Sequence, residues 1–234
     1  MPDTPPILCY VTDRHRLRIT PGENPVEALL EKMQTAAATG LDWIQIREKD
    51  LSGKDCAALA REALRRVAQA TPPASRAPST LAPRIVINDR LDVAIAERAG
   101  GVHLGENSLP VREAKRLIAA APPGSNMKNN FLAGVSCHSL EAAQSAAADG
   151  ADYLFFGPVF ATPSKAAFGA PQGLEALARV CRDVSIPVFA IGGITLENAA
   201  SCLASGAAGI AAIRLFQDAA DLTRLVARLR QLHS

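Results

Sequence analysis

The chain has 234 residues, of which 48% are hydrophobic and 21% are charged, and its formal net charge is +2. This length suits one α/β barrel of about 200–250 residues, and the near-balanced charge supplies no basic run for binding nucleic acid. Aromatic residues make up only 4% of the chain. Alanine, leucine and valine are therefore expected to form the core, as in parallel sheets covered by helices.

The chain has five cysteines, an odd number at wide spacing, without a C-x-x-C pair. This pattern predicts neither a zinc site nor a disulfide framework, and it favours free thiols in a reducing compartment. The stretch Met1–Ile7 has no signal-peptide core, and no apolar run is long enough to span a bilayer. We therefore expect a cytoplasmic protein that binds neither a membrane nor nucleic acid.

Short apolar runs alternate with longer amphipathic runs along the chain. The expected strands are Ile7–Val11, Trp43–Ile46, Arg84–Ile87, Gly101–Leu104, Phe131–Val135, Tyr153–Phe156, Pro187–Ile191 and Gly209–Ile213. The expected helices are Pro25–Thr39, Ser52–Ala70, Leu91–Ala99, Pro110–Ala120, Leu140–Ala148, Leu174–Cys181, Leu196–Ala204 and Ala219–Leu232. Strands that alternate with helices form parallel sheets through right-handed crossovers. The pattern predicts a single (β/α)8 TIM barrel over residues 1–234.

A doubly wound open sheet is the alternative architecture for this pattern. The count of eight units and the lack of a G-x-G-x-x-G after the first strand favour the closed barrel. Two stretches, Thr71–Pro83 and Ala121–Asn130, carry the Pro, Ser and Asn residues of surface loops. Because both follow helices, they are expected on the barrel face opposite the usual active site.

Polar residues gather where the expected strands end, which is the end that carries chemistry in such barrels. Gln45, Arg47 and Lys49 alternate along one strand and its continuation, so they are expected to project from the same side. An amide can recognise the edge of a heterocycle, and two cations can hold a phosphate or diphosphate. A belt of salt bridges at the barrel mouth is the alternative explanation for the same residues.

Two further features suggest phosphate chemistry. Asp89 follows an apolar strand and is a candidate Mg²⁺ ligand, although capping the helix that begins at Leu91 is the favoured interpretation of this residue alone. The Gly192-Gly193 pair lets the backbone approach a ligand closely, and the helix start that follows attracts phosphate. His103 and His138 are expected to be structural.

Eight motifs, in this order, make the chain resemble the superfamily of thiamine-phosphate synthases and thiazole tautomerases, and it resembles the synthases more closely. The motifs are Tyr10–Asp13, Gln45–Lys49, Asn88–Arg90, Gly101–Gly105, Gly134–Ser136, Gly157–Phe160, Thr162–Lys165 and Ile191–Ile194. The resemblance implies a Mg²⁺-dependent transferase of thiamine biosynthesis. It would join 4-amino-5-hydroxymethyl-2-methylpyrimidine diphosphate to a thiazole phosphate and release diphosphate.

The resemblance also implies roles for individual residues. Gln45 would contact the pyrimidine, and Ser136 would lie beside the reacting ring. The implied diphosphate ligands are Arg47, Lys49, Asn88 and Lys165, with Asp89 binding Mg²⁺. Thr162 and Ser164 would lie near the thiazole phosphate or the leaving group. Gly193 and the turn at Ile213 and Arg214 would surround the thiazole phosphate. The implied catalytic residues are Arg47, Lys49, Ser136 and Lys165.

Two departures from the family pattern keep other functions open. Ser108 stands where the family usually has a second metal-binding Asp, and Arg214 stands where the family usually has a Ser-Ala turn. One alternative is a thiazole tautomerase that uses His138 as its acid-base residue. The other is a non-catalytic protein that binds thiamine phosphate. Small-molecule substrates are expected in the catalytic cases, and a homo-oligomer is compatible with the family.

Overall fold

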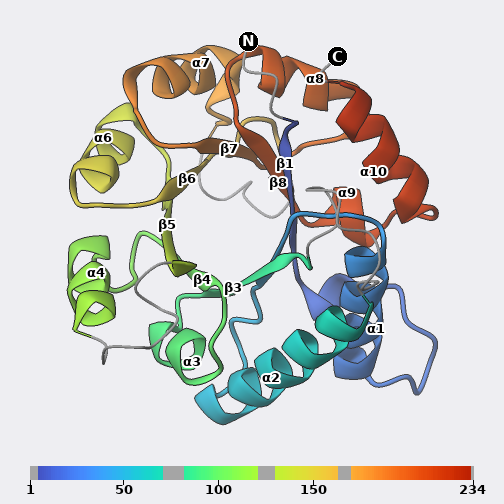
Figure 1. The fold of residues 1–234 in the computed structure, drawn as a ribbon. Helices are drawn as coiled ribbons and strands as arrows, with labels where there is room; N and C mark the ends of the chain where they lie inside the picture. Colours follow the sequence, from blue (N-terminus) through green and yellow to red (C-terminus); the bar gives the residue numbers. More distant parts are fainter. Residues whose placement is uncertain (1–4, 71–81, 121–129, 163–169, 233–234) are drawn as a thin grey trace.

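A computed structural model describes residues 5–70, 82–120, 130–162 and 170–232. Eight parallel strands close into a barrel in chain order, with β8 pairing back onto β1 (Figure 1). The strands are β1 Ile7–Val11, β2 Trp43–Ile46, β3 Arg84–Asn88, β4 Gly101–Leu104, β5 Leu132–Cys137, β6 Tyr153–Phe156, β7 Val188–Ile191 and β8 Gly209–Ala212. The predicted (β/α)8 TIM barrel is confirmed.

Helices cover the outer face of the barrel (Figure 1). They are α1 Pro25–Ala38, α2 Gly53–Ala70, α3 Leu91–Ala96, α4 Val111–Ala119, α6 Leu140–Ala148, α7 Gly173–Asp183, α8 Leu196–Ala204, α9 Arg214–Gln217 and α10 Leu222–Gln231. A 3-10 helix, η1, covers Arg14–Arg16. In the described ranges, no helix is long and apolar enough to cross a bilayer.

Most predicted elements appear within a few residues of their expected bounds. The differences at the last helix and at two short helices have physical causes. The last helix begins at Leu222 rather than Ala219 because the Asp221 side chain accepts a hydrogen bond from the Arg224 N–H and caps α10. The short helices η1 and α9 were not predicted, because three or four residues are too few to establish a helical period. The predicted loops 71–83 and 121–130 lie almost wholly outside the described residues.

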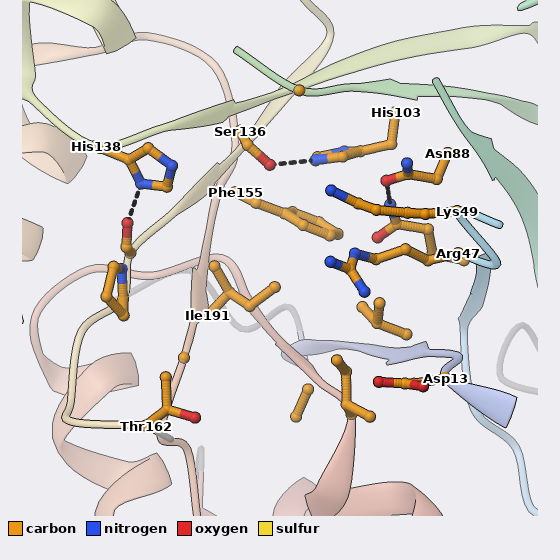
Figure 2. Close-up of a pocket in the computed structure, with 18 of the residues that line it drawn as sticks. Asp13, Arg47, Lys49, Asn88, His103, Ser136, His138, Phe155, Thr162 and Ile191 are labelled. Carbon is orange, nitrogen blue, oxygen red and sulfur yellow. Dashed lines mark hydrogen bonds between the residues drawn. The ribbon is translucent and has the colours of Figure 1, made fainter. Parts of the chain in front are cut away.

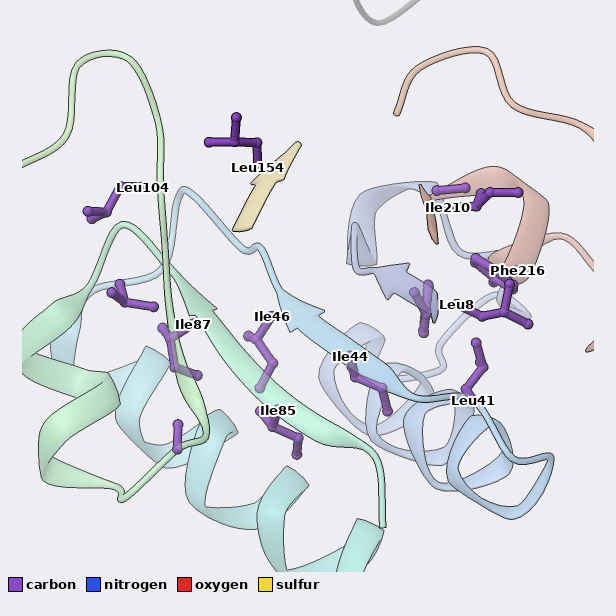
Figure 3. Packing of buried hydrophobic residues seen from close by; sticks show 14 of the residues in the cluster. Leu8, Leu41, Ile44, Ile46, Ile85, Ile87, Leu104, Leu154, Ile210 and Phe216 are labelled. Atoms are coloured by element: carbon purple, nitrogen blue, oxygen red, sulfur yellow. The ribbon is translucent and has the colours of Figure 1, made fainter. Parts of the chain in front are cut away.

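Two apolar layers follow from the alternation of side chains along each strand. One set of strand residues points outward and packs under the helices, as Ile44, Ile46, Ile85 and Ile87 show in Figure 3. The alternate set fills the barrel interior; its buried members are Cys9, Val11, Trp43, Val86, Tyr153, Phe155, Phe189 and Ala211. Both layers are buried, which explains why the strands read as continuous apolar runs.

Aromatic rings fill the barrel interior beneath the strand ends. Tyr153 lies edge-on to Trp43, with ring centroids 4.7 Å apart, and packs against Phe189 at 5.5 Å. Phe155 continues the stack toward the carboxyl ends and lies 4.1 Å from the His103 ring. Gly134 makes room for this packing, because a Cβ there would lie 2.0 Å from the Tyr153 ring. The side chains at the mouth therefore rest on a rigid floor.

Arg230 of α10 forms hydrogen bonds with residues at the amino-terminal end of the barrel. Its guanidinium donates to the Gly40 carbonyl at 3.0 Å, to the Asp42 carboxylate at 2.7 Å and to the Pro6 carbonyl. The same Asp42 oxygen accepts the Leu8 N–H at 2.7 Å. The last helix is thus tied to the starts of the first two strands.

Candidate functional site

The carboxyl ends of the strands surround a cavity of about 930 Å³. Every strand contributes a lining residue: Val11, Gln45, Asn88, His103, Ser136, Phe155, Ile191 and, at the end of β8, Ala212. This volume lies within the range of about 300–1,000 Å³ that is usual for small-molecule sites. The place of the cavity is that of the active site in TIM-barrel enzymes.

The predicted site residues within the described ranges all line this one cavity. They are Gln45, Arg47, Lys49, Asn88, Asp89, Ser136, Thr162, Gly193, Ile213 and Arg214. Ser164 and Lys165 lie outside the described residues. Figure 2 shows Arg47, Lys49 and Asn88 together on one side of the cavity and Thr162 on another.

Arg47 and Lys49 both line the cavity and are drawn on the same side of it in Figure 2. Neither forms an ion pair with any described residue, because the neighbouring carboxylates of Glu48 and Asp50 pair with Arg14 instead. The alternative of a salt-bridge belt is therefore wrong for these two cations. Their positive charge is available to an anionic ligand.

Gln45 presents a buried acceptor to the cavity. The side chain is 2% exposed, and its Nε2 donates to Asn88 Oδ1 at 2.8 Å. Its Oε1 has no hydrogen-bond partner among the described residues. A buried acceptor without a donor costs about 1–3 kcal/mol. This oxygen is suited to a ligand that brings an N–H or O–H group.

Asp89 does not cap the helix that follows it, so the favoured interpretation from sequence is wrong. The N-cap position of α3 is Arg90, which makes no side-chain cap. Asp89 has a φ of 61°, and its Oδ1 accepts from the Gly105 N–H at 3.0 Å and from the Ser108 hydroxyl. Asn88 Nδ2 donates to the other carboxylate oxygen at 2.7 Å. The carboxylate therefore faces the β4 loop at the cavity rim.

The oxygen atoms around Asp89 can hold Mg²⁺ only when a bound ligand supplies the remaining oxygens of the coordination shell. Glu106 lines the same cavity as Asp89, but in the ranges that the structure describes no three His, Cys, Asp or Glu residues come together around a possible metal position. Magnesium commonly uses one or two carboxylates and takes its other oxygens from water and substrate phosphates. The residues present fit a Mg²⁺ ion shared with a phosphorylated ligand.

His103 reaches the cavity from β4 and bridges two hydroxyl groups. Its Nε2 lies 2.8 Å from Ser136 Oγ (Figure 2), and its Nδ1 lies 3.1 Å from Tyr153 Oη. Burial lowers the pKa of the imidazole to about 3, so the ring is neutral at neutral pH. His103 was expected to be structural, and it also lines the cavity.

His138 lies across the cavity from Lys49 (Figure 2). Its Nδ1 is hydrogen-bonded to the carbonyl of Gly157, in the loop after β6. One ring nitrogen is therefore engaged with the backbone. This contact fits the structural role expected for His138.

Two glycines directly after β7 line the cavity. Gly192 and Gly193 have φ values of 93° and 69°, in the left-handed region that favours glycine. A Cβ on Gly193 would lie 2.7 Å from the Ala161 carbonyl oxygen, so the loop after β6 packs directly against this turn. Arg214 lines the same cavity and forms no ion pair with the described residues.

Sequence reasoning did not assign several residues that line the cavity. Asp13 and Arg16 form an ion pair, with Oδ2 and Nε 3.1 Å apart, and Phe155 and Gln172 contribute an apolar and an amide surface. Two signals pointed to Asp13: its position directly after a strand, and its place in the motif Tyr10–Asp13. No spacing identifies Arg16, because it lies on the short helix η1.

A family model described as thiamine monophosphate synthase matches residues 16–216. The chain belongs to this family. The thiamine-phosphate synthase of Methanoculleus marisnigri is 44% identical over 195 residues, which cover 83% of each chain. That of Moorella thermoacetica is 38% identical over 205 residues, which cover 87% of each chain. A solved structure of thiamine phosphate pyrophosphorylase from Pyrococcus furiosus has a TM-score of 0.75 at 30% identity, covering 97% of this chain and 95% of its own.

Membership of the thiamine monophosphate synthase family confirms the predicted function. The chain is a transferase of thiamine biosynthesis. The relatives named above are synthases and not tautomerases. The chain also covers most of the length of each.

Proposed function

We propose that this chain transfers the pyrimidine of 4-amino-5-hydroxymethyl-2-methylpyrimidine diphosphate to a thiazole phosphate, using Mg²⁺, and releases diphosphate. The observation that carries the proposal is the composition of one cavity. Arg47 and Lys49 form no ion pairs with the described residues, and they share the cavity with the partnerless Oε1 of Gln45. A ligand that is anionic at one end and carries an N–H donor at the other matches this arrangement.

The pyrimidine lies against Gln45 and Ser136 in this proposal. The exocyclic amine of the ring donates to Gln45 Oε1, which satisfies the buried acceptor. Gln45 is itself fixed by its hydrogen bond to Asn88. Binding of the pyrimidine at Gln45 is thereby coupled to the position of Asn88, whose amide is proposed to contact the diphosphate.

The diphosphate lies against Arg47, Lys49 and Asn88, and we propose that Lys165 also reaches it. The bond from the ring methylene carbon to the diphosphate oxygen breaks, and its electron pair leaves with the diphosphate. Cations neutralise the growing negative charge, so no protein nucleophile is needed. When bound, Mg²⁺ adds charge neutralisation to the leaving group, and Asp89 is the proposed ligand.

The thiazole phosphate occupies another part of the same cavity in this proposal. Gly193, Ile213, Arg214 and Thr162 all line the cavity. We propose that the glycine turn lets the backbone approach the phosphate and that Ser164 and Thr162 lie near it or near the leaving group. The thiazole nitrogen then attacks the methylene carbon, and holding both partners in place supplies the remaining catalysis.

The compartment, the domain organisation and the oligomeric state of the enzyme are also proposals. All five cysteines are free thiols, as in proteins of a reducing compartment, and we propose a cytoplasmic enzyme of one domain over residues 1–234. Its substrates are small molecules. A homo-oligomer remains the expectation from the family.

The test is synthesis of thiamine phosphate by the purified protein from both substrates, with and without Mg²⁺. We expect metal-dependent product, and we expect Arg47→Met and Lys49→Met each to lower kcat/KM by at least about 10-fold, because each removes a charge-assisted contact. Lys54→Met is the matched control, because this exposed lysine on α2 does not line the cavity. Absence of product at every Mg²⁺ concentration would contradict the proposal.

A further inference from the structure

We infer that Tyr153 and His103 are positioning residues that fix the direction of the hydrogen bonds at Ser136, so that the Ser136 hydroxyl donates its proton to the bound ligand. The identity of that ligand rests on the proposed function. The direction of the hydrogen bonds does not, because it follows from contacts within the protein.

The argument begins at the Tyr153 phenol, which lies inside the barrel with its residue 1% exposed. Its hydroxyl has one hydrogen-bond partner in the described part of the chain, His103 Nδ1 at 3.1 Å. A buried O–H group requires an acceptor, and burial keeps this phenol protonated by holding its pKa well above the ordinary value. Tyr153 therefore donates to Nδ1.

The tautomer of His103 follows from that donation. A neutral imidazole carries one donor and one acceptor nitrogen. Since Nδ1 accepts from Tyr153, the proton is on Nε2, which donates to Ser136 Oγ at 2.8 Å. The opposite tautomer, or a charged ring, would leave the buried phenol hydrogen without an acceptor, which is unfavourable.

Ser136 is the last residue in this series of hydrogen bonds. Its Oγ accepts from His103, and in the described ranges the side chain has no second hydrogen-bond partner. The residue lines the cavity, so its hydroxyl hydrogen is free to point toward a ligand. The group that receives it is an acceptor on the pyrimidine diphosphate, either a ring nitrogen or a diphosphate oxygen.

Aromatic packing holds the two positioning residues in place. His103 lies 4.1 Å from the Phe155 ring, and Tyr153 packs against both Trp43 and Phe189. Because the barrel interior is filled around Tyr153, that ring cannot swing away without opening a cavity, and His103 is held by its contacts with Tyr153 and Phe155. The donor direction at Ser136 is thus built into the core.

The first test reads the tautomer by ¹⁵N NMR of protein labelled at histidine, at pH 7.5 and without substrate. We expect His103 to show a protonated Nε2 and an unprotonated Nδ1, and His103→Gln assigns the signal. In Tyr153→Phe, the loss of the donor to Nδ1 should give a mixture of tautomers. A proton on Nδ1 in the unsubstituted protein overturns the inference, whether or not that protein makes thiamine phosphate.

The second test is a double-mutant cycle on kcat. We expect Tyr153→Phe to lower kcat by about 3- to 10-fold, the size of one hydrogen bond, and Ser136→Ala to lower it at least as much. If Tyr153 acts through Ser136, the double variant should be no slower than Ser136→Ala alone. Multiplicative losses would show that the two residues act separately and would overturn the inference.

Two further comparisons separate this role from a structural one. His103→Gln keeps an amide N–H near the Nε2 position and should retain more activity than His103→Leu at equal thermal stability. Calorimetric binding of 4-amino-5-hydroxymethyl-2-methylpyrimidine and of inorganic diphosphate, to the unsubstituted protein and to Ser136→Ala, identifies the acceptor. Weaker binding of either probe supports the donor role, and unchanged binding of both contradicts it.

Discussion

His103 is a basic side chain kept neutral inside the barrel, where its two ring nitrogens contact hydroxyl groups. Burial lowers its folded-state pKa to about 3, against 6.5 for an unperturbed histidine. Between these values the unfolded chain takes up a proton that the folded protein does not. The free energy of unfolding therefore falls as pH falls, by up to about 1.4 kcal/mol per pH unit.

The prediction for His103 compares urea unfolding at pH 7.5 and pH 5.0. The unsubstituted protein should lose about 2 kcal/mol more than His103→Gln over this interval, because glutamine does not titrate. The contribution of His103 is complete above about pH 6.5 and is lost as pH falls. Equal losses in both proteins would show that His103 does not carry this linkage.

The Ser108 hydroxyl donates to the carboxylate of Asp89, the proposed Mg²⁺ ligand, and serine adds no negative charge there. A second carboxylate at this position should raise affinity for divalent metal in the absence of diphosphate. We predict that Ser108→Asp binds Mn²⁺ at least about 10-fold more tightly than the unsubstituted protein, by calorimetry. Ser108→Asn, which adds no charge, is the control and should not show this gain. Equal Mn²⁺ affinity in all three proteins would contradict the prediction.

Among the elements, α10 depends on Arg230 for its attachment to the barrel. Arg230 bridges two backbone carbonyls and the Asp42 carboxylate, whereas Arg228 on the same helix is exposed. We predict that Arg230→Met lowers the free energy of unfolding by about 1–3 kcal/mol, because three partly buried hydrogen bonds are lost. Arg228→Met should change it by less than about 0.5 kcal/mol in the same urea experiment. Similar losses in both variants would argue against this attachment.

The sequence predicts the elements better than it predicts their contacts. Apolar runs and amphipathic helices repeat locally, so the barrel could be recognised without any long-range information. The contacts of His103 could not be predicted, because its partners Ser136 and Tyr153 lie 33 and 50 residues away in the sequence. Asp89 was misjudged because a positive φ turns its carboxylate away from the helix, and no local pattern shows that.

At the scale of the whole molecule, the barrel separates residues that stabilise it from residues that bind ligands. Arg84 begins β3, at the end opposite the cavity, where it donates to the Gly100 and Asn130 carbonyls and lies over the Trp43 ring at 5.8 Å. We predict that Arg84→Met lowers stability by about 1–3 kcal/mol and leaves KM for both substrates unchanged. Arg61→Met, which removes an exposed ion pair with Glu97, should cost less than about 1 kcal/mol. A changed KM in Arg84→Met would contradict the separation.

Trp43 is the single tryptophan of the chain, and it touches the Tyr153 ring inside the barrel. Tyr153 in turn contacts His103 at the cavity floor. The natural tryptophan fluorescence of the protein therefore comes from a ring that contacts Tyr153. Tyr153 is hydrogen-bonded to His103, which contacts Ser136. We therefore expect both ligand binding and barrel unfolding to change the fluorescence of this one ring, without an attached dye.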